Sequence, residues 1–274
     1  MVCFLKNIGK KGDEMSLHLF YSPVEAIEVI IKGNLKKVYG EIEKVFLTGI
    51  LGGVFIGVAG IGQISIIQNV NPANESLMKF IGAAVFPVGL ILCLLLGGTL
   101  FTGNCLLFVN YFKKDITLKQ IWKNLSITWV GNFIGGAGVA LISYLAGMFD
   151  PITMQNTVVN IATGKLALSF SKCIFSGFLC NILVVAGIWL STSSKDSAGK
   201  FYGCWFPIML FVISGYQHVV ANMFIITMAK LVSPESINFL GSFVSHFLPV
   251  TIGNFLSGGI VFPMVFYYLY VHKK

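Results

Sequence analysis

The chain has 274 residues, of which 55% are hydrophobic and only 11% are charged, and its formal net charge is +8. Soluble domains carry about twice that charged fraction, so the composition excludes an ordinary soluble domain and indicates an integral membrane protein. All 19 basic residues are lysines, and they lie between apolar stretches and at the chain ends rather than on one polar face, which disfavours a nucleic-acid surface.

The first segment, residues 1–44, is polar and holds seven lysines. It lacks the long apolar core of a cleavable signal peptide, so we expect it to remain as a cytoplasmic segment. Within it, "SPVEAIEVIIKGNLKKV" predicts an amphipathic helix over about 22–38, with Ser22 as N-cap, Pro23 as first helical residue and Glu25 as capping-box partner. We expect this helix to lie on the membrane surface.

Six apolar stretches follow, each long enough to cross a bilayer as a helix. They cover residues 45–68, 80–112, 121–148, 171–191, 201–230 and 246–270. We therefore expect a single membrane domain over 45–270 and a short cytoplasmic C-terminus at 271–274. Fifteen lysines lie on the side that holds both termini and four on the other, so the positive-inside rule predicts a multi-pass protein of the cytoplasmic membrane with both termini in the cytoplasm.

The second and fifth stretches are longer than one crossing requires, because about 20 helical residues span the ~30 Å apolar core. The excess lies at "GGTLFTGN" (97–104) and "SGYQHVVAN" (214–222), where glycine and polar residues disfavour a continuous helix. Irregular backbone at membrane depth is tolerated where it is buried in protein or lines a polar cavity, so these interruptions predict a substrate pathway. The alternative is a pair of kinks that let helices pack closely.

The sequence also repeats internally. The interruptions end at Asn104 and Asn222, and two further motifs recur at a similar offset. These motifs are "VGNFIGG" (130–136) with "IGNFLSGG" (252–259), and "VAGI" at 58–61 and again at 185–188. The two repeat units, 45–148 and 171–270, hold three spans each, so the second enters the membrane in the opposite orientation and the interruptions are expected to meet near the midplane.

His218 is the one histidine in the middle of a span, and it lies inside the second interruption. An ionisable group inside a membrane is a functional-site hypothesis by default, although a lone histidine on an apolar face is more often a satisfied core residue. Thr102, in the first interruption, is placed to hydrogen-bond it. No acidic residue falls well inside a span, which argues against a cation pore, and free N–H groups at helix breaks favour an anion. Lys165 adds a cation at an outer vestibule, unless it is a solvated loop residue.

Other classes of protein fit less well. The six cysteines form no CxxC pair, so we expect no disulfide, no metal site and no cofactor. One histidine in the middle of a span cannot supply a metalloprotease, Ser/Lys or bis-histidine haem site, which argues against a membrane enzyme. A water or glycerol channel would share the topology, but it would require an Asn-Pro-Ala triplet at each of the two breaks, and neither break contains one.

Five motifs, in order along residues 20–270, resemble those of the formate/nitrite transporter family. They are "GLILCLLLGGTLFTGN" (89–104), "TWVGNFIGG" (128–136), "GFLCNILVVAGIW" (177–189), "SGYQHVVANMF" (214–224) and "PVTIGNFLSGG" (249–259). The resemblance implies an all-α, aquaporin-like protomer with six transmembrane helices in an inverted 3+3 repeat, the second and fifth broken, and a ring of five protomers with one pore each. It implies small monovalent anions of weak acids as substrates: formate or nitrite, or alternatively hydrosulfide.

The resemblance also assigns residues. Thr102 and His218 match the family's central threonine and histidine, and Lys165 and Asn181 match its vestibule lysine and a nearby asparagine. The remaining matches are Leu100 with Phe211 at an inner constriction, Phe86 with Leu90 at an outer one, and Asn132 and Asn254 as the asparagines of the third and sixth spans.

Two positions depart from the family pattern, which usually has acids where this chain has Thr99 and Gln217. Gln217 can hydrogen-bond but adds no negative charge beside His218. The resulting hypothesis is that lysines concentrate the anion and apolar rings exclude its charge, so that it crosses the bilayer with a proton. His218 either donates this proton or polarises the site so that water can.

Overall fold

The structure is a computed structural model that describes residues 19–272. Within that range the chain is helical, and its only β-type pairing is an isolated bridge between Phe20 and Ser194. The elements are α1 (Pro23–Tyr39), α2 (Ile42–Ile67), α3 (Glu75–Val85), α4 (Val88–Leu96), α5 (Phe101–Asn104), η1 (Cys105–Leu107), α6 (Phe108–Phe112), α7 (Leu118–Leu145), α8 (Ile152–Leu166), α9 (Phe170–Ser193), α10 (Ser197–Ile213), α11 (Val219–Val232), η2 (Pro234–Ser236), α12 (Phe239–Ser242), η3 (Phe243–Phe247), α13 (Leu248–Phe255), η4 (Leu256–Val261), α14 (Phe262–Phe266) and η5 (Tyr267–Val271).

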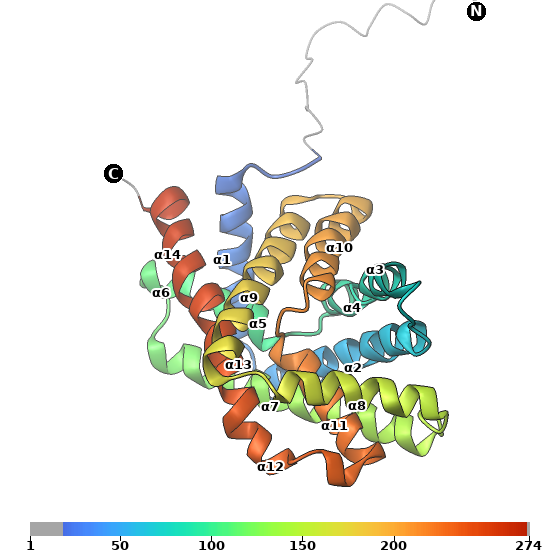
Figure 1. Cartoon of the computed structure of the whole chain (residues 1–274). Helices are drawn as coiled ribbons and strands as arrows, with labels where there is room; N and C mark the ends of the chain where they lie inside the picture. Colours follow the sequence, from blue (N-terminus) through green and yellow to red (C-terminus); the bar gives the residue numbers. More distant parts are fainter. Residues whose placement is uncertain (1–18, 273–274) are drawn as a thin grey trace, which may run out of the picture.

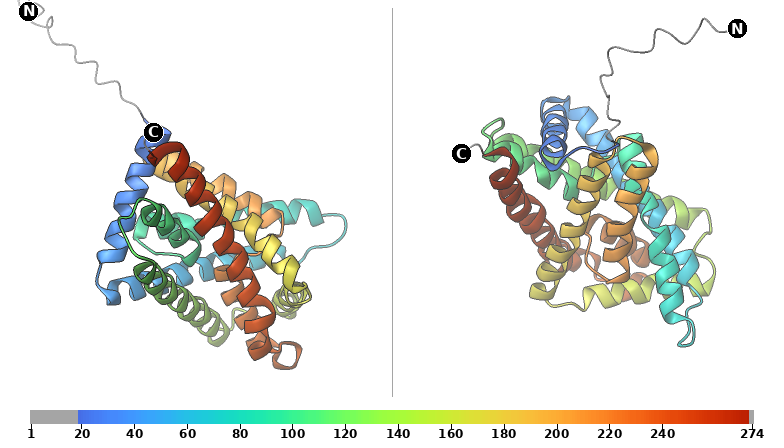
Figure 2. Two further views of the ribbon diagram at one scale, coloured as in Figure 1. Left: turned by 90° about the vertical axis from the view of Figure 1, so that its left-hand side faces the viewer. Right: turned by 90° about the horizontal axis from the view of Figure 1, so that it is seen from above.

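Five helical runs in the described chain are long and apolar enough to cross a membrane. They are α2, the run of α3 and α4, α7, α9, and the continuous run from α12 to η5, which crosses the whole molecule in red in Figures 1 and 2. Two shorter apolar helices, α10 and α11, form the remaining crossing. The protein is therefore an all-α, multi-pass membrane protein with six crossings, as the sequence predicts.

Close helix contacts at glycine hold each half together. Helix α2 packs along α7 in the first half, and α9 packs along α13 in the second. A Cβ atom at Gly53 would lie 2.1 Å from the carbonyl oxygen of Asn132, and one at Gly253 would lie 2.1 Å from that of Ile174. Lipid tails are as apolar as the side chains, so helix association in a membrane depends on such close packing rather than on hydrophobic burial.

Both broken crossings turn at a glycine with positive φ. Gly97 (φ 84°) follows α4, and Gly215 (φ 71°) follows α10, in the left-handed region that side chains disfavour. The chain then becomes extended at Leu100 and His218, which are the N-cap residues of α5 and α11. Each interruption is thus shorter than its sequence motif, because the helix resumes within the motif.

Asn132 and Asn254 stabilise the two breaks through matching hydrogen bonds. The Nδ2 of Asn132 donates to the carbonyls of Gly49 (2.7 Å) and Thr99 (2.8 Å), and its Oδ1 accepts the N–H of Phe101 (2.8 Å). The Nδ2 of Asn254 donates to the carbonyls of Gly177 (2.7 Å) and Gln217 (3.0 Å), and its Oδ1 accepts the N–H of Val219 (3.0 Å). Peptide groups freed by a break must be satisfied inside the protein at membrane depth, and one asparagine does this in each half. The two halves are therefore copies of one three-span unit.

Helix α1 begins with the capping box of Ser22 and Glu25, but its position differs from the expectation. We expected its apolar face to lie on the membrane surface. Instead Ile27, Ile30 and Ile31 are buried against protein, in a cluster that includes Leu106, Val109 and Val185. The helix also contacts η5, so the two ends of the described chain lie together (Figure 2, left).

Helix α8 was not expected from the sequence, because its mixed composition shows no long apolar run. It precedes α9 as α1 precedes α2, and it packs against α11 and α2. The repeat unit therefore comprises a short helix and three crossings, and the short helix carries a lysine near its end in both copies: Lys37 in α1 and Lys165 in α8.

Candidate functional site

The two breaks bring Thr102 and His218 into contact. Thr102 Oγ1 lies 3.0 Å from His218 Nε2, and the two side chains are 0% and 2% exposed. His218 also caps α11, since its Nδ1 accepts the N–H of Ala221 at 3.3 Å. Because Nδ1 is an acceptor, the proton of the neutral imidazole lies on Nε2 and is donated to Thr102. The hydroxyl hydrogen of Thr102 is then free to bind an acceptor.

Aromatic rings cover His218 on one side. Phe211 stacks on the imidazole, with ring centroids 5.6 Å apart and an angle of 29° between the planes. Phe86 meets Phe211 edge-on at 5.9 Å and 82°. Leu90 and Leu100 are also buried, at 3% and 4% exposure. The polar centre is thus enclosed by apolar side chains.

A cavity of about 380 Å³ leads to this centre from one side. We call it the Lys165 cavity; Phe86, Lys165, Phe211 and His218 are among its lining residues. Phe211 and Phe86 thus line the same cavity. The Nζ of Lys165 donates to Gln217 Oε1 at 3.0 Å. Burial lowers the pKa of Lys165 to about 8, because removal from water disfavours the ammonium.

A second cavity of about 270 Å³, the Lys37 cavity, reaches the first break. Its lining includes Lys37, Thr99 and Asn104. The Nζ of Lys37 donates to Asn104 Oδ1 at 3.0 Å, and burial lowers the pKa of this lysine to about 8 as well. Each break therefore has a partly buried lysine beside it.

Lys37 is the repeat counterpart of Lys165, and sequence reasoning missed it. The two lysines stand the same number of residues before Gly49 and Gly177, the glycines that bind Asn132 and Asn254. The repeat offset between the two halves was visible in the sequence. We used it to match the membrane spans, but not to match the segments that precede the first span of each half.

Asn181 links the two breaks. It is fully buried and does not line the Lys165 cavity. Its Nδ2 donates to the carbonyl oxygens of Thr102 (3.2 Å) and Asn254 (2.7 Å). Asn181 thus joins the two breaks inside the protein.

Thr99 and Gln217, the two positions that depart from the family pattern, make different contacts. Thr99 lies 3.1 Å from Thr48, hydroxyl oxygen to hydroxyl oxygen, in the Lys37 cavity. Gln217 binds Lys165 with its carbonyl oxygen and donates from Nε2 to the carbonyl of Gly215 at 3.1 Å. The amide of Gln217 therefore replaces a carboxylate as the partner of the lysine without adding charge.

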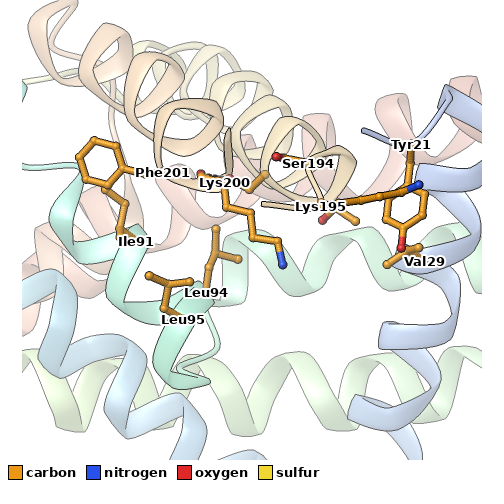
Figure 3. Close-up of a pocket in the computed structure, with 11 residues that line it drawn as sticks. Tyr21, Val29, Ile91, Leu94, Leu95, Ser194, Lys195, Lys200 and Phe201 are labelled. Carbon is orange, nitrogen blue, oxygen red and sulfur yellow. Dashed lines mark hydrogen bonds between the residues drawn. The ribbon is translucent and has the colours of Figure 1, made fainter. Parts of the chain in front are cut away.

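Two other features lie apart from the breaks. A cavity of about 460 Å³ lies between α1, α4 and the α9–α10 turn, where Lys195 extends over the ring of Tyr21 at 4.5 Å (Figure 3). None of the site residues expected from the sequence lines it. Within residues 19–272, no group of His, Cys, Asp and Glu side chains could hold a metal ion.

Paired helix breaks, each facing a lysine-bearing cavity and meeting at a buried polar pair, define a membrane channel or transporter built as an inverted repeat. The comparison with known families agrees: the formate/nitrite transporter family model matches residues 24–269. The chain belongs to this family.

Similar proteins are channels and transporters rather than enzymes. An uncharacterized transporter, YrhG, from Bacillus subtilis is 39% identical over 93% of this chain and 95% of its own. The formate channel BtFdhC from Bacillus thuringiensis is 36% identical, over 87% and 92% of the two chains. The formate channel FocA from Escherichia coli is 30% identical, over 84% and 88%.

Solved structures share the fold. A pentameric formate channel with formate bound matches with a TM-score of 0.78 at 28% identity, over 84% of this chain and 98% of that one. An ion channel of the same family matches with a TM-score of 0.81 at 25% identity, over 89% and 98%. The inverted six-helix architecture is therefore that of the family.

Proposed function

We propose that the protein is a channel for small monovalent anions of weak acids, with formate or nitrite favoured, and that each anion crosses together with a proton. The observation that carries this proposal is the buried Thr102–His218 pair between two lysine-bearing cavities. Relatives named as formate channels support formate. Hydrosulfide, another weak-acid anion of similar size, is the alternative substrate.

The two lysines explain how an anion reaches the breaks. Lys165 and Lys37 are cationic below about pH 8, and each lines a cavity beside one of the breaks. A cation in such a cavity raises the local concentration of anions. The anion would bind next to the lysine before it meets the apolar rings.

The apolar rings explain why a proton is needed. A charged side chain at the centre of a membrane costs roughly 2.5–3.5 kcal/mol on insertion scales, and a small anion between Phe86, Phe211 and Leu100 meets a similarly apolar surface. A weak acid avoids this cost when it takes up one proton and crosses as a neutral molecule. A strong-acid anion such as chloride cannot do so.

The geometry of His218 favours water as the immediate proton donor. Its Nδ1 accepts the N–H of Ala221, so a proton could enter there only by breaking the cap of α11. If Nε2–H were given to the substrate, the ring would have no ready route to recover a proton. We therefore assign to His218 and Thr102 the role of hydrogen-bond donors that polarise the site, while a water molecule gives its proton to the anion and the hydroxide returns to the same side.

The remaining assignments follow from the lysine distribution and the structural relatives. The Lys37 cavity faces the cytoplasm and the Lys165 cavity faces outward, because the lysine-rich segments share the side of α1. We propose a cytoplasmic segment over 1–44, a membrane domain over 45–270 and a cytoplasmic end at 271–274; residues 1–18 and 273–274 lie outside the described residues. The pentameric state of the matched formate channel supports a homopentamer in the lipid bilayer.

The test is flux in proteoliposomes that contain a pH-sensitive dye. Formate, nitrite, hydrosulfide and chloride are added in turn at equal concentration. We expect the weak-acid anions to acidify the lumen and chloride not to, and the relative initial rates identify the preferred substrate. Equal passage of chloride would overturn proton-coupled transport. Passage of water or glycerol without any anion would favour a neutral-solute channel.

A further inference from the structure

His246 is a second buried histidine that the proposed function does not use. It lies in η3 with 0% exposure, whereas the sequence suggested only the end of a span. Its Nε2 is 2.9 Å from Asn222 Nδ2, and its Nδ1 is 3.5 Å from Cys173 Sγ. A buried imidazole with a defined partner on each nitrogen requires an explanation.

The directions of the hydrogen bonds around His246 can be assigned by starting at Lys165 and following the bonds through Gln217 and Asn222. The Lys165 ammonium can only donate, so the atom of Gln217 that it contacts at 3.0 Å is the carbonyl oxygen Oε1. The Nε2 of Gln217 donates to the Gly215 carbonyl, which confirms this orientation. The same Oε1 lies 3.1 Å from Asn222, so Asn222 must present its Nδ2 there.

This orientation sets the tautomer of His246. The Nδ2 of Asn222 donates one hydrogen to Gln217 and the other to His246 Nε2, which therefore must be an unprotonated acceptor. The ring proton then lies on Nδ1 and points to Cys173. Asn222 Oδ1 has no hydrogen-bond partner within the described structure, so the amide is held by its nitrogen alone.

The first half of the protein contains the same arrangement with a different residue. Asn104, the counterpart of Asn222, donates from Nδ2 to Asn124 Oδ1 at 2.9 Å. Asn124 stands as many residues before Asn132 as His246 stands before Asn254. The position therefore requires an acceptor in both halves, and only the copy beside Lys165 can be protonated.

We propose that His246 is a positioning residue for Lys165, which acts through Asn222 and Gln217 to fix the ammonium in its cavity. This inference rests on the proposed function, because it assigns the arrangement to the capture of the anion from that side. As a neutral acceptor, His246 keeps Asn222 in the orientation that Gln217 needs. The two faces of the channel then differ in one respect. The acceptor that supports anion capture is the amide of Asn124 at the Lys37 cavity and the imidazole of His246 at the Lys165 cavity.

Protonation of His246 would reverse its contact with Asn222. An N–H on Nε2 would face the N–H of Asn222, and a turn of the amide would place its oxygen opposite the carbonyl oxygen of Gln217. The titratable groups facing His246 are Lys165 on α8 and Cys173 on α9. Neither α12 nor α13 carries a titratable side chain, and Lys230 of α11 instead binds the carbonyls of Pro234 and Ile237.

Two substitutions separate positioning from a general structural role. His246→Asn reproduces the acceptor that the first half has in Asn124, and His246→Leu removes it. Formate uptake by intact cells reports the Lys165 side, and inverted membrane vesicles report the Lys37 side. We expect His246→Leu to raise the half-saturation concentration about two- to tenfold at the Lys165 side only, as for the loss of one hydrogen bond, and His246→Asn to stay near the wild type at pH 7.

The outcomes that contradict the proposal are distinct. An unchanged half-saturation concentration in His246→Leu, or an equal rise at both faces, would overturn positioning at the Lys165 cavity. So would a His246→Asn protein that behaves as His246→Leu does.

The tautomer of His246 can be measured without any transport assay, so this test does not depend on the proposed function. Solid-state ¹⁵N NMR of histidine-labelled wild-type protein and His246→Asn at pH 7 identifies the signals of His246 by difference. We expect the lost signals to be those of a neutral ring protonated at Nδ1. A ring protonated at Nε2 would overturn the inference even if formate is transported, and the expected tautomer would stand even if the channel carried another anion.

Discussion

Thr102 and His218 are 116 residues apart in the sequence, yet Thr102 Oγ1 lies 3.0 Å from His218 Nε2 where the two broken crossings meet. The contact depends on the repeat, because each residue follows a glycine turn that an asparagine of the same half stabilises. The direction of the bond, from Nε2–H to the hydroxyl, leaves the hydroxyl hydrogen of Thr102 available as a donor.

Removal of the central donors should impair transport without unfolding the protein. In Thr102→Val the side chain keeps its shape but loses the hydroxyl, and in His218→Phe the ring stays while the Nε2–H and the Nδ1 cap of α11 are lost. We expect each to lower proton-coupled formate flux at least tenfold, since donors aimed at a charge in a dry site contribute strongly. Dye-loaded proteoliposomes measure this flux. Flux and pH dependence equal to the wild type in His218→Phe would remove His218 from the mechanism.

The two cavity lysines should act on separate faces. Lys37→Gln should raise the half-saturation concentration for formate at the cytoplasmic face, and Lys165→Gln should raise it at the outer face, because each removes the cation of one cavity. Lys32→Gln is the matched control, since Lys32 is on α1 but exposed. Sided uptake measurements in cells and inverted vesicles test this. An effect of Lys32→Gln as large as that of Lys37→Gln would indicate general surface charge instead.

Anion capture should weaken as the pH rises through the range set by Lys165. Burial lowers its pKa to about 8, so the side chain is an ammonium below that pH and increasingly a neutral amine above it. We expect the outer half-saturation concentration of the wild type to rise between about pH 7 and pH 9. Lys165→Arg stays charged throughout, so its curve should remain flat. Identical curves for the two proteins would refute the assignment.

Glycine contacts between helices should dominate stability within each half. Gly253→Ala forces a Cβ to 2.1 Å from the carbonyl oxygen of Ile174, and overpacking of this kind costs about 1–3 kcal/mol. Gly138→Ala is the control, because a Cβ there meets nothing within 4 Å. The midpoint of thermal unfolding in detergent should fall for Gly253→Ala and stay level or rise for Gly138→Ala. A similar loss in both would mean that helix flexibility, not packing, is the cause.

The sequence predicted the features that depend on local composition and on the repeat. Glycine and polar residues located both breaks, the Ser22 and Glu25 spacing located the start of α1, and the repeat indicated that Thr102 and His218 approach each other. The contacts that the sequence did not predict have another cause. The hydrogen bonds of Asn181 and His246 join elements that are distant in the sequence, and no pattern along the chain encodes them. Lys37 could have been predicted from the sequence, because the number of residues between it and Lys165 is close to the offset of the repeat.

The central claim is that the substrate passes the apolar rings as a neutral acid. The most direct test is the accumulation of formate in proteoliposomes under an imposed pH gradient and, separately, under a potassium diffusion potential set with valinomycin. The account predicts that accumulation follows the pH gradient and does not respond to the potential. Accumulation that follows the potential in the absence of a pH gradient would show that formate crosses as a charged anion and would contradict the account.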